Sequence, residues 1–519
     1  MKPTSTSTFT FSNLVEGGYV YVDKTARIHT LAAVGSGQYF LARPRRFGKS
    51  LLVSTLKALF EARRNLFRGL AIDALPWDWT PIPVIHLDMG SAQARNADEL
   101  RLVLAEIMDA AARGAGVSYP GDLTPSGKFL FLAEALARRS PTGKIAILVD
   151  EYDKPILGLL GHPEVSGVKS VLKAFYSVIK TTEPLQRFVL VTGVSKFSKV
   201  SIFSDLNNLT DLTMDARAAD LLGYTHEEVL ANFPEHLDAF AETLGTTRGE
   251  AFAELVKWYD GYHFDENSPA MFNPVSVGKA LSSRKIKNYW FETGTPTFLL
   301  ELLKRHPVDF GDLELPEHAF SVYEPEAPAV LPLLVQTGYL TIKEARREGV
   351  VSIYRLDYPN REVSSSFSYH LSQLAASDWR EPEMEGFVGG MARALRAGDA
   401  AAMVDQLRTF FAAIPYDIAI SSEKYYQSLF YAAFLLLGAR VDVEVRTNLG
   451  RIDAVVRVPG FVYVFEFKIK ASSAAALAQI RERRYFERYL GSGDRVILVG
   501  AGFSLKTRNL VRPKMETLP

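Results

Sequence analysis

The sequence predicts an α/β protein whose N-terminal part is a three-layer domain built around a parallel sheet. Four short segments are apolar through nearly their full length, as expected of parallel strands covered on both faces: Tyr39–Ala42, Val84–Leu87, Ile145–Val149 and Phe188–Thr192. Longer segments with helical periodicity alternate with them, at Leu51–Arg64, Ala97–Ala112, Lys128–Arg139 and Val168–Thr181. This alternation over residues 14–235 is a βαβ rhythm, which favours helices on both faces of the sheet.

The composition is that of a globular protein with several domains. A chain of 519 residues is long enough for about three domains. The 59 Lys and Arg residues balance the 59 Asp and Glu residues, so affinity for nucleic acid requires a local basic patch. The chain has no cysteine, which excludes disulfides, thiolate zinc sites, Fe–S clusters and a cysteine nucleophile.

The N-terminal residues do not resemble a secretion signal. Met1–Asn13 is rich in Ser and Thr and has no apolar core segment after Lys2. The longest apolar runs, such as Phe430–Gly438, are far shorter than the roughly 20 residues that cross a bilayer. We therefore expect a cytoplasmic protein that does not associate with membranes.

The middle of the chain has a different pattern. Helices are expected at His236–Tyr262, Asn273–Leu281 and Thr297–Lys304, followed by a short strand at Tyr339–Lys343. We interpret residues 236–345 as a helical lid or winged-helix-like region. Residues 346–415 are expected to form a mostly helical connector.

The C-terminal part, residues 416–519, predicts a second α/β domain. Its expected order is a helix, three strands, a helix and a strand, at Glu423–Leu437, Val441–Arg446, Ile452–Val458, Phe461–Lys468, Ala474–Tyr489 and Arg495–Val499. The first domain then covers residues 1–235.

A candidate phosphate site follows the first strand. Residues 43–50 read Arg-Pro-Arg-Arg-Phe-Gly-Lys-Ser and match the last three positions of G-x-x-x-x-G-K-[ST], while Arg43 replaces the first glycine. Gly48 lets backbone amides turn toward an anion, Lys49 can reach the β and γ phosphates, and the Ser50 hydroxyl can bind Mg²⁺. The cluster of Arg43, Arg45 and Arg46 either adds positive charge over the phosphates or forms a solvated basic loop.

Polar side chains at two further strand ends complete this site. Asp150 and Glu151 follow the buried strand Ile145–Val149, at the sheet edge where a nucleotide-bound Mg²⁺ is held. We expect Asp150 to hold the metal through water and Glu151 to polarise the attacking water. The alternative is that these carboxylates cap the next segment. Thr192 either senses the γ-phosphate or simply forms a turn with Gly193.

A second cluster of charged residues lies on a predicted hairpin near the C-terminus. Glu466 and Lys468 are two residues apart on one strand, so they share a face. If the hairpin is centred between Pro459 and Gly460, residues whose numbers sum to 919 are opposite each other, and Asp453 is opposite Glu466. Facing carboxylates need neutralisation, which a divalent cation supplies, and Lys468 can activate metal-bound water. The alternative is a solvent-facing ion network.

Basic residues with interleaved aromatic residues follow this hairpin. They are either a patch that contacts a phosphate backbone or the solvated face of an amphipathic helix, and they comprise Lys470, Arg481, Arg483, Arg484 and Arg488, with Tyr485 and Tyr489.

Several stretches resemble the bacterial AAA-ATPase-like family, P-loop proteins of the STAND-like kind that are commonly fused to a PD-(D/E)XK nuclease-like domain. The resemblance covers nearly the whole chain and rests on Tyr21-Val-Asp-Lys-Thr, Arg43-Pro-Arg-Arg-Phe-Gly-Lys-Ser-Leu, Leu148-Val-Asp-Glu-Tyr-Asp-Lys-Pro, Thr192-Gly-Val-Ser-Lys-Phe-Ser-Lys, Asp260-Gly-Tyr and Trp290-Phe-Glu-Thr-Gly-Thr-Pro. The missing first glycine is usual in that family.

The C-terminal order helix, D-x₁₂-E-x-K, helix, strand resembles the core of PD-(D/E)XK nucleases, which have a restriction-endonuclease-like fold. Asp453, Glu466 and Lys468 fall on that motif. The resemblance also implies Glu423 as the acid of the first helix and Gln479 as the polar residue that helps to position substrate or metal.

We therefore expect an ATPase that regulates a Mg²⁺- or Mn²⁺-dependent nuclease on the same chain. DNA is the expected substrate, with RNA as the alternative. The competing hypothesis is a STAND-like switch or scaffold whose C-terminal domain binds nucleic acid or protein without cutting. No arginine finger can be assigned, and one supplied by a neighbouring subunit would require a homo-oligomer.

Overall fold

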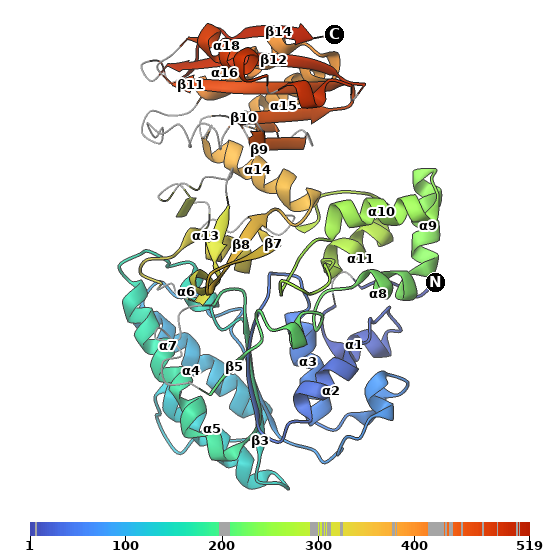
Figure 1. The fold of residues 1–519 in the computed structure, drawn as a ribbon. Coiled ribbons are helices and arrows are strands. Elements are labelled where there is room, and N and C mark those ends of the chain that lie inside the picture. The colour runs from blue at the N-terminus through green and yellow to red at the C-terminus, as the bar shows by residue number, and fades with distance from the viewer. Residues whose placement is uncertain are drawn as a thin grey trace. The chain divides into compact units, whose positions relative to one another are not determined.

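The computed structural model divides into two compact units (Figure 1). The N-terminal unit is Met1–Glu292 with Glu314–Asn360, and the C-terminal unit is Thr293–Leu313 with Arg361–Pro519. The structure describes the chain apart from residues 6–7, 197–207, 291–298, 300–301, 304–305, 307, 309–312, 322–324, 376–378, 380, 414–429, 431–432, 435–439, 448–449, 470–471, 485, 492, 505–506, 508 and 519, and apart from the side chains of 321, 373–375, 381, 440–447, 450–453 and 469.

A five-stranded, all-parallel sheet forms the centre of the N-terminal unit. Its order is β2-β3-β4-β1-β5, with β1 at Gly37–Ala42, β2 at Val84–Asp88, β3 at Ile145–Asp150, β4 at Gln186–Gly193 and β5 at Thr210–Asp211. The four strands expected from the sequence are confirmed. Because β4 lies between β1 and β3, its carboxyl end lies between the loop of residues 43–48, called the phosphate loop below, and the acidic pair Asp150 and Glu151.

Helices cover both faces of this sheet. In Figure 1, α1–α3 lie on one side of it and α4, α5 and α7 on the other. Their bounds are α1 Phe11–Glu16, α2 Thr25–Ala32, α3 Lys49–Phe60, α4 Ala97–Gly114, α5 Pro125–Arg139, α6 Lys154–Leu157 and α7 Val165–Thr181, with short 3₁₀ turns η1 Arg64–Phe67, η2 Ala71–Ala74 and η3 Glu183–Leu185. The predicted three-layer α/β domain is therefore present.

The alternation of side chains along each strand determines which face of the sheet carries the polar residues. Ala146 and Leu148 of β3 and Leu190 of β4 belong to the hydrophobic core that also contains α3 residues. Successive side chains alternate between faces. Asp150 and Thr192 therefore share the face covered by α3, whose first residue is Lys49.

The middle region is helical, as expected from the sequence, but the single helix expected at His236–Tyr262 is divided at Gly245, where φ is 65°. The helical region also begins before the expected start at residue 236. The remaining helices of this unit are α8 His226–Asn232, α9 Pro234–Leu244, α10 Arg248–Tyr259, α11 Pro274–Ser283 and α13 Val330–Gln336, with 3₁₀ turns η4 Ala216–Ala218 and η6 Glu317–Ser321. The helix expected at Thr297–Lys304 falls largely outside the described residues.

A three-stranded sheet in this region extends beyond the expected single strand. Its order is β6-β8-β7, with β6 at Glu314–Pro316, β7 at Thr341–Glu348 and β8 at Val351–Asp357. The strand expected at Tyr339–Lys343 is the start of β7, so the expected boundary at residue 345 falls within that strand. Charged cross-strand pairs hold its exposed half, including Arg355 with Glu344 at 2.5 Å.

The C-terminal unit contains a mixed six-stranded sheet and flanking helices. The sheet order is β13-β12-β11-β10-β9, with β14 also paired to β12. The strands are β9 Arg440–Thr447, β10 Gly450–Val458, β11 Phe461–Ile469, β12 Arg495–Ser504, β13 Asn509–Leu510 and β14 Lys514–Leu518, and the helices are α14 Arg361–Ala375, α15 Glu381–Ala397, α16 Ala400–Ala412, α18 Ser473–Arg483 and the 3₁₀ turn η7 Glu487–Tyr489.

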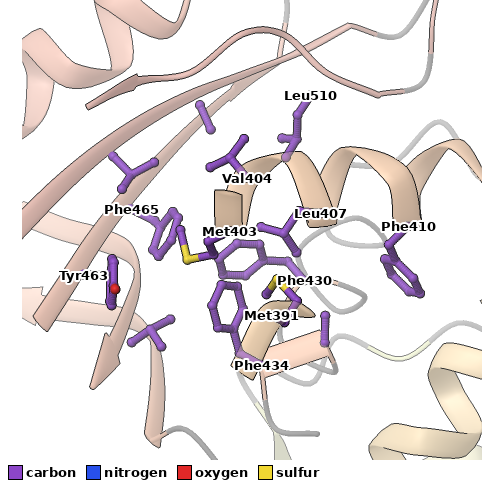
Figure 2. Packing of buried hydrophobic residues seen from close by; sticks show 14 of the residues in the cluster. Met391, Met403, Val404, Leu407, Phe410, Phe430, Phe434, Tyr463, Phe465 and Leu510 are labelled. Atoms are coloured by element: carbon purple, nitrogen blue, oxygen red, sulfur yellow. The ribbon is translucent and has the colours of Figure 1, made fainter. Parts of the chain in front are cut away.

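Both faces of this sheet are buried by apolar side chains. One face packs against α15 and α16 through the cluster in Figure 2, which includes Met391, Met403, Leu407 and Phe465. The other face, which carries Val464, packs with Ile480 of α18. Such two-sided burial explains why the central strands read as almost continuous apolar runs.

Within the described part of the chain, no helix is both long enough and apolar enough to cross a membrane.

Candidate functional site

The phosphate loop has backbone conformations suited to an anion. It connects β1 to α3, and its two residues with positive φ are Arg46 at 67° and Gly48 at 95°. Left-handed residues in such a loop turn successive amide N–H groups toward a common centre. The helix that begins at Lys49 adds the positive end of its dipole, and Ser50 is exposed on its first turn.

Lys49 is held inside the loop by two backbone carbonyl groups. Its Nζ donates to the oxygens of Arg43 and Pro44, both at 2.9 Å, and the residue is only 7% exposed. An ammonium group has three N–H donors, so these bonds fix its direction and leave a third donor for a phosphate oxygen. Burial lowers the pKa of Lys49, and the nearby carboxylates of Asp150, Glu151 and Asp153 oppose that shift.

Arg43, which replaces the first glycine of the motif, is a structural residue. It is 1% exposed, and its guanidinium donates to the carbonyl oxygens of Ala42 at 3.0 Å, Thr213 at 2.7 Å and Ala218 at 2.9 Å. The guanidinium also lies 4.1 Å from the ring centroid of Phe264. Burial lowers the pKa of Arg43 to about 9. Through these hydrogen bonds, the side chain therefore links the start of the loop to the segment that follows β5.

This role predicts that restoring the motif harms the protein. In Arg43→Gly, three carbonyl groups lose their donor, and we expect a loss of about 3 kcal/mol in unfolding free energy together with weaker ATP binding. Arg43→Lys retains the positive charge but lacks the planar guanidinium with its several N–H donors, so we expect an intermediate loss of unfolding free energy. Thermal melts and nucleotide titrations measure both effects, and tighter ATP binding by Arg43→Gly would contradict this assignment.

The other two arginines of the loop lie against the segment that follows α11. The Arg46 guanidinium donates to the backbone oxygen of Tyr289. The indole N–H of Trp290 donates to the backbone oxygen of Arg45 at 3.4 Å. Arg45 itself is exposed.

The acidic pair and Thr192 meet at the carboxyl ends of β3 and β4. The Thr192 hydroxyl donates to Asp150 Oδ1 at 2.6 Å, and the same oxygen accepts the Glu151 N–H at 3.0 Å. Thr192 therefore orients Asp150 in this structure. Glu151 has φ of 54°, a conformation that is costly for a residue with a side chain and is typical of functional sites. Burial raises the pKa of Glu151 above its usual value.

Sequence reasoning did not assign Asp153, three residues after Asp150. Its carboxylate is almost fully buried and accepts hydrogen bonds from the loop after β4. The only available signal was its place in the acidic run after β3, which equally suits a helix cap.

The C-terminal hairpin has the register that the sequence predicts. β10 and β11 pair from Val458–Phe461 to Ala454–Phe465, so paired residue numbers sum to 919. The turn is Pro459-Gly460 with Gly460 at φ 87°, the residue pattern of a type II turn. Asp453 and Glu466 are the next residues of these two strands.

Glu466 is the centre of the described part of this site. It is 1% exposed, lies on the face of β11 that α18 covers, and accepts hydrogen bonds at Oε1 from the Gln479 amide and from Lys468 Nζ, the latter at 3.1 Å. The structure therefore brings together three of the predicted residues. Glu423 and the side chain of Asp453 lie outside the described residues.

A close helix–sheet contact positions Gln479. Gly500 of β12 is paired with Glu466. A Cβ atom at Gly500 would lie 2.4 Å from both the Leu477 nitrogen and the Ser473 oxygen of α18. The missing side chain lets α18 approach the sheet closely enough for Gln479 to reach Glu466.

Two family models match this chain in the regions just described. Residues 6–203 match the model described as predicted AAA-ATPase, and residues 421–512 match that of the PD-(D/E)XK nuclease superfamily. The "Uncharacterized protein in vnfD 5′region" of Azotobacter chroococcum mcd 1 is 37% identical over 525 residues, covering 98% of each chain. The chain belongs to this family of AAA-ATPase-like proteins with a C-terminal PD-(D/E)XK domain.

The basic cluster of the PD-(D/E)XK domain is partly neutralised by its own carboxylates. Arg481 pairs with Glu516 of β14 at 2.6 Å, and Arg484 pairs with Glu487. Arg457 and Arg488 both lie over the ring of Tyr489, which is buried. The helix expected to continue to Tyr489 ends at Arg483, because Arg484 has a positive φ of 50°. Lys470 and Tyr485 lie outside the described residues.

The two sites of this AAA-ATPase-like protein offer different oxygen ligands to a metal ion. Among the side chains that the structure describes, no group of three His, Asp or Glu residues could hold a metal ion. At the nuclease-like site, the buried carboxylate of Glu466 suits a hard cation with oxygen ligands. At the phosphate loop, Ser50 and Asp150 carry oxygen atoms, the ligand type that Mg²⁺ prefers.

Proposed function

We propose that this protein binds and hydrolyses ATP at the phosphate loop. The observation that carries this proposal is the fixed direction of Lys49 beside the acidic pair. Lys49 and the loop amides would hold the phosphates, while Ser50 and Asp150 would hold Mg²⁺, the latter through water. Mg²⁺ neutralises charge that develops on the phosphoryl oxygens. Glu151 would polarise the attacking water.

We further propose that the C-terminal domain is a metal-dependent nuclease that acts on DNA. Asp453 and Glu466 would hold Mg²⁺ or Mn²⁺, which activates water for attack on the phosphodiester. Lys468 would stabilise negative charge on the phosphate, and Gln479 would orient the Glu466 carboxylate. The buried carboxylate of Glu466, which accepts hydrogen bonds from the partly exposed Lys468 and Gln479, supports this proposal because a solvated surface network would not need a buried carboxylate.

The two activities are proposed to be coupled, with ATP controlling access to the nuclease site. The observation behind this is the presence of both sites on one chain. Population shift requires only that ATP bind two arrangements of the protein with different affinities. The competing function is a nucleotide-dependent switch or scaffold whose C-terminal domain binds nucleic acid or protein without cutting. The internal pairing of Arg481 and Arg484 leaves fewer free cations for a phosphate backbone, which favours the protein-binding form of this alternative.

The test is cleavage of supercoiled plasmid and of single-stranded RNA with Mg²⁺ or Mn²⁺, with and without ATP. Wild type, Glu466→Gln, Lys49→Ala and the control Glu482→Gln are compared, because Glu482 is exposed on α18. Cleavage that Glu466→Gln abolishes and Glu482→Gln retains is the expected result, and altered ATP dependence in Lys49→Ala supports coupling. ATP binding without any cleavage would favour the switch.

A further inference from the structure

Asp153 is a buried carboxylate that the site above does not use. It is 1% exposed, and its Oδ2 accepts hydrogen bonds from the Val194 N–H at 3.1 Å, the Ser195 N–H at 2.7 Å and the Ser195 hydroxyl at 2.6 Å. Burying a carboxylate is costly unless such donors replace water. The side chain is therefore bound by hydrogen bonds to the segment 192–195 at the end of β4.

This arrangement differs from a helix cap. Asp153 precedes α6, yet its side chain makes no capping hydrogen bond to that helix. Its hydrogen bonds instead connect the turn after β3 with the end of the neighbouring strand.

Segment 192–195 contacts Asp150, the turn after β3 and the first residue of the phosphate loop. The Thr192 hydroxyl orients Asp150, and the Thr192 carbonyl accepts the Tyr152 N–H at 2.9 Å. The Gly193 carbonyl accepts the N–H of Arg43, the first residue of the phosphate loop, at 3.1 Å. A displacement of this segment would therefore move both Asp150 and the loop.

The packing around the segment leaves no room for such a displacement to be absorbed. A Cβ atom at Gly193 would lie 2.5 Å from the Tyr152 ring and 2.7 Å from Asp153 Oδ1. The Tyr152 hydroxyl also donates to the Ser195 carbonyl at 3.0 Å. The turn after β3 and the end of β4 are thus in direct contact along four residues.

We propose that Asp153 is a positioning residue for ATP hydrolysis. It holds segment 192–195 so that Thr192 directs Asp150 toward the metal and Gly193 fixes the start of the phosphate loop. The proposal rests on the proposed ATPase function and assigns Asp153 no contact with nucleotide. The proposed role of Asp153 therefore differs from that of Lys49, which binds the phosphates of the nucleotide.

Asp153→Asn tests this because it keeps the volume but removes the charge and replaces one of the two acceptor oxygens, which both lie within hydrogen-bond distance of the Val194 N–H, with a donor. We expect kcat for ATP hydrolysis to fall about 10- to 100-fold, as small misplacements of reacting groups do. We expect the Kd for a non-hydrolysable ATP analogue to change less than about threefold. Ser195→Ala removes one donor, so a smaller fall in kcat at unchanged Kd is expected, and Ser170→Ala, on the exposed face of α7, is the matched control.

Hydrolysis at the wild-type rate by Asp153→Asn would overturn the proposal. So would an equal loss of analogue binding and kcat, which a merely structural role produces. If Asp153→Asn does not fold, the Ser195→Ala variant provides the test. A kcat of Ser195→Ala equal to that of the control Ser170→Ala would then overturn the proposal. Failure of the ATPase function itself is recognised separately, since wild type would then bind no analogue or Lys49→Ala would bind it equally.

Discussion

Gly500→Ala is expected to lose about 3 kcal/mol of the unfolding free energy of the C-terminal unit and to abolish nucleic-acid cleavage. The new methyl group would overlap the backbone of α18 at Ser473 and Leu477, each 2.4 Å away. Backbone atoms cannot rotate aside as a flexible side chain can, so α18 must shift away from β12. That shift withdraws Gln479 from Glu466 and opens the apolar contact between Ile480 and Val464.

Denaturant unfolding of the full-length chain, followed with a cleavage assay, measures this effect. Gly386→Ala is the matched control, because Gly386 is exposed on α15 of the same unit and a Cβ there meets no atom within 4 Å. Removing glycine from a helix is expected to stabilise by about 0.5–1 kcal/mol. Wild-type stability in Gly500→Ala would show that α18 does not pack as closely as described.

Local patterns in the sequence were sufficient to predict the parallel sheet and the hairpin register. The strands β1–β4 are apolar on both faces, and a two-residue turn at Pro459-Gly460 fixes which residues pair. The sheet β6-β8-β7 was largely missed because β7, read as Thr-Ile-Lys-Glu-Ala-Arg-Arg-Glu, is mostly charged and exposed. Its strand state depends on cross-strand ion pairs that no local pattern reveals.

Long-range contacts explain what sequence reasoning missed in the sites. Arg43 is separated by 170 residues from its acceptor Thr213, so no local sequence pattern could indicate that it links the phosphate loop to the segment after β5. Asp153 and Ser195 are 42 residues apart and meet only because β4 lies beside β3. The Gln479–Glu466 contact was reached by family resemblance, and its physical cause is the absent side chain at Gly500.

Glu151→Gln is expected to lower kcat for ATP hydrolysis by about 10²–10³-fold while stabilising the N-terminal unit. In the proposed mechanism the carboxylate polarises water, and glutamine cannot accept a proton. Burial raises the pKa of Glu151, so its ionised form is disfavoured in the folded state. The variant removes that cost at neutral pH, and we expect its Tm to rise by about 1–2 °C.

The sign of the pH dependence follows from the same shift. At a pH above the raised pKa of Glu151, both the folded and the unfolded wild type carry the ionised carboxylate, and the folded state bears the cost of burying it. As pH falls through the raised pKa of Glu151 toward its usual value of 4.5, protonation removes that cost. The Tm difference between Glu151→Gln and wild type should therefore be largest near pH 7 and shrink toward pH 4.5, while wild-type hydrolysis declines over the same range.

Thermal melts and hydrolysis rates between pH 4.5 and 8 measure both trends, with Glu106→Gln as the matched control. Glu106 is exposed on α4 of the same unit, so neither its Tm difference nor its kcat should follow this pattern. A Glu151→Gln protein that is less stable than wild type at pH 7 would mean that the carboxylate stabilises the fold. Because position 151 is expected to keep its unfavourable φ in both proteins, the comparison isolates the charge. Stability gained with activity lost is what distinguishes a residue retained for chemistry from one retained for structure.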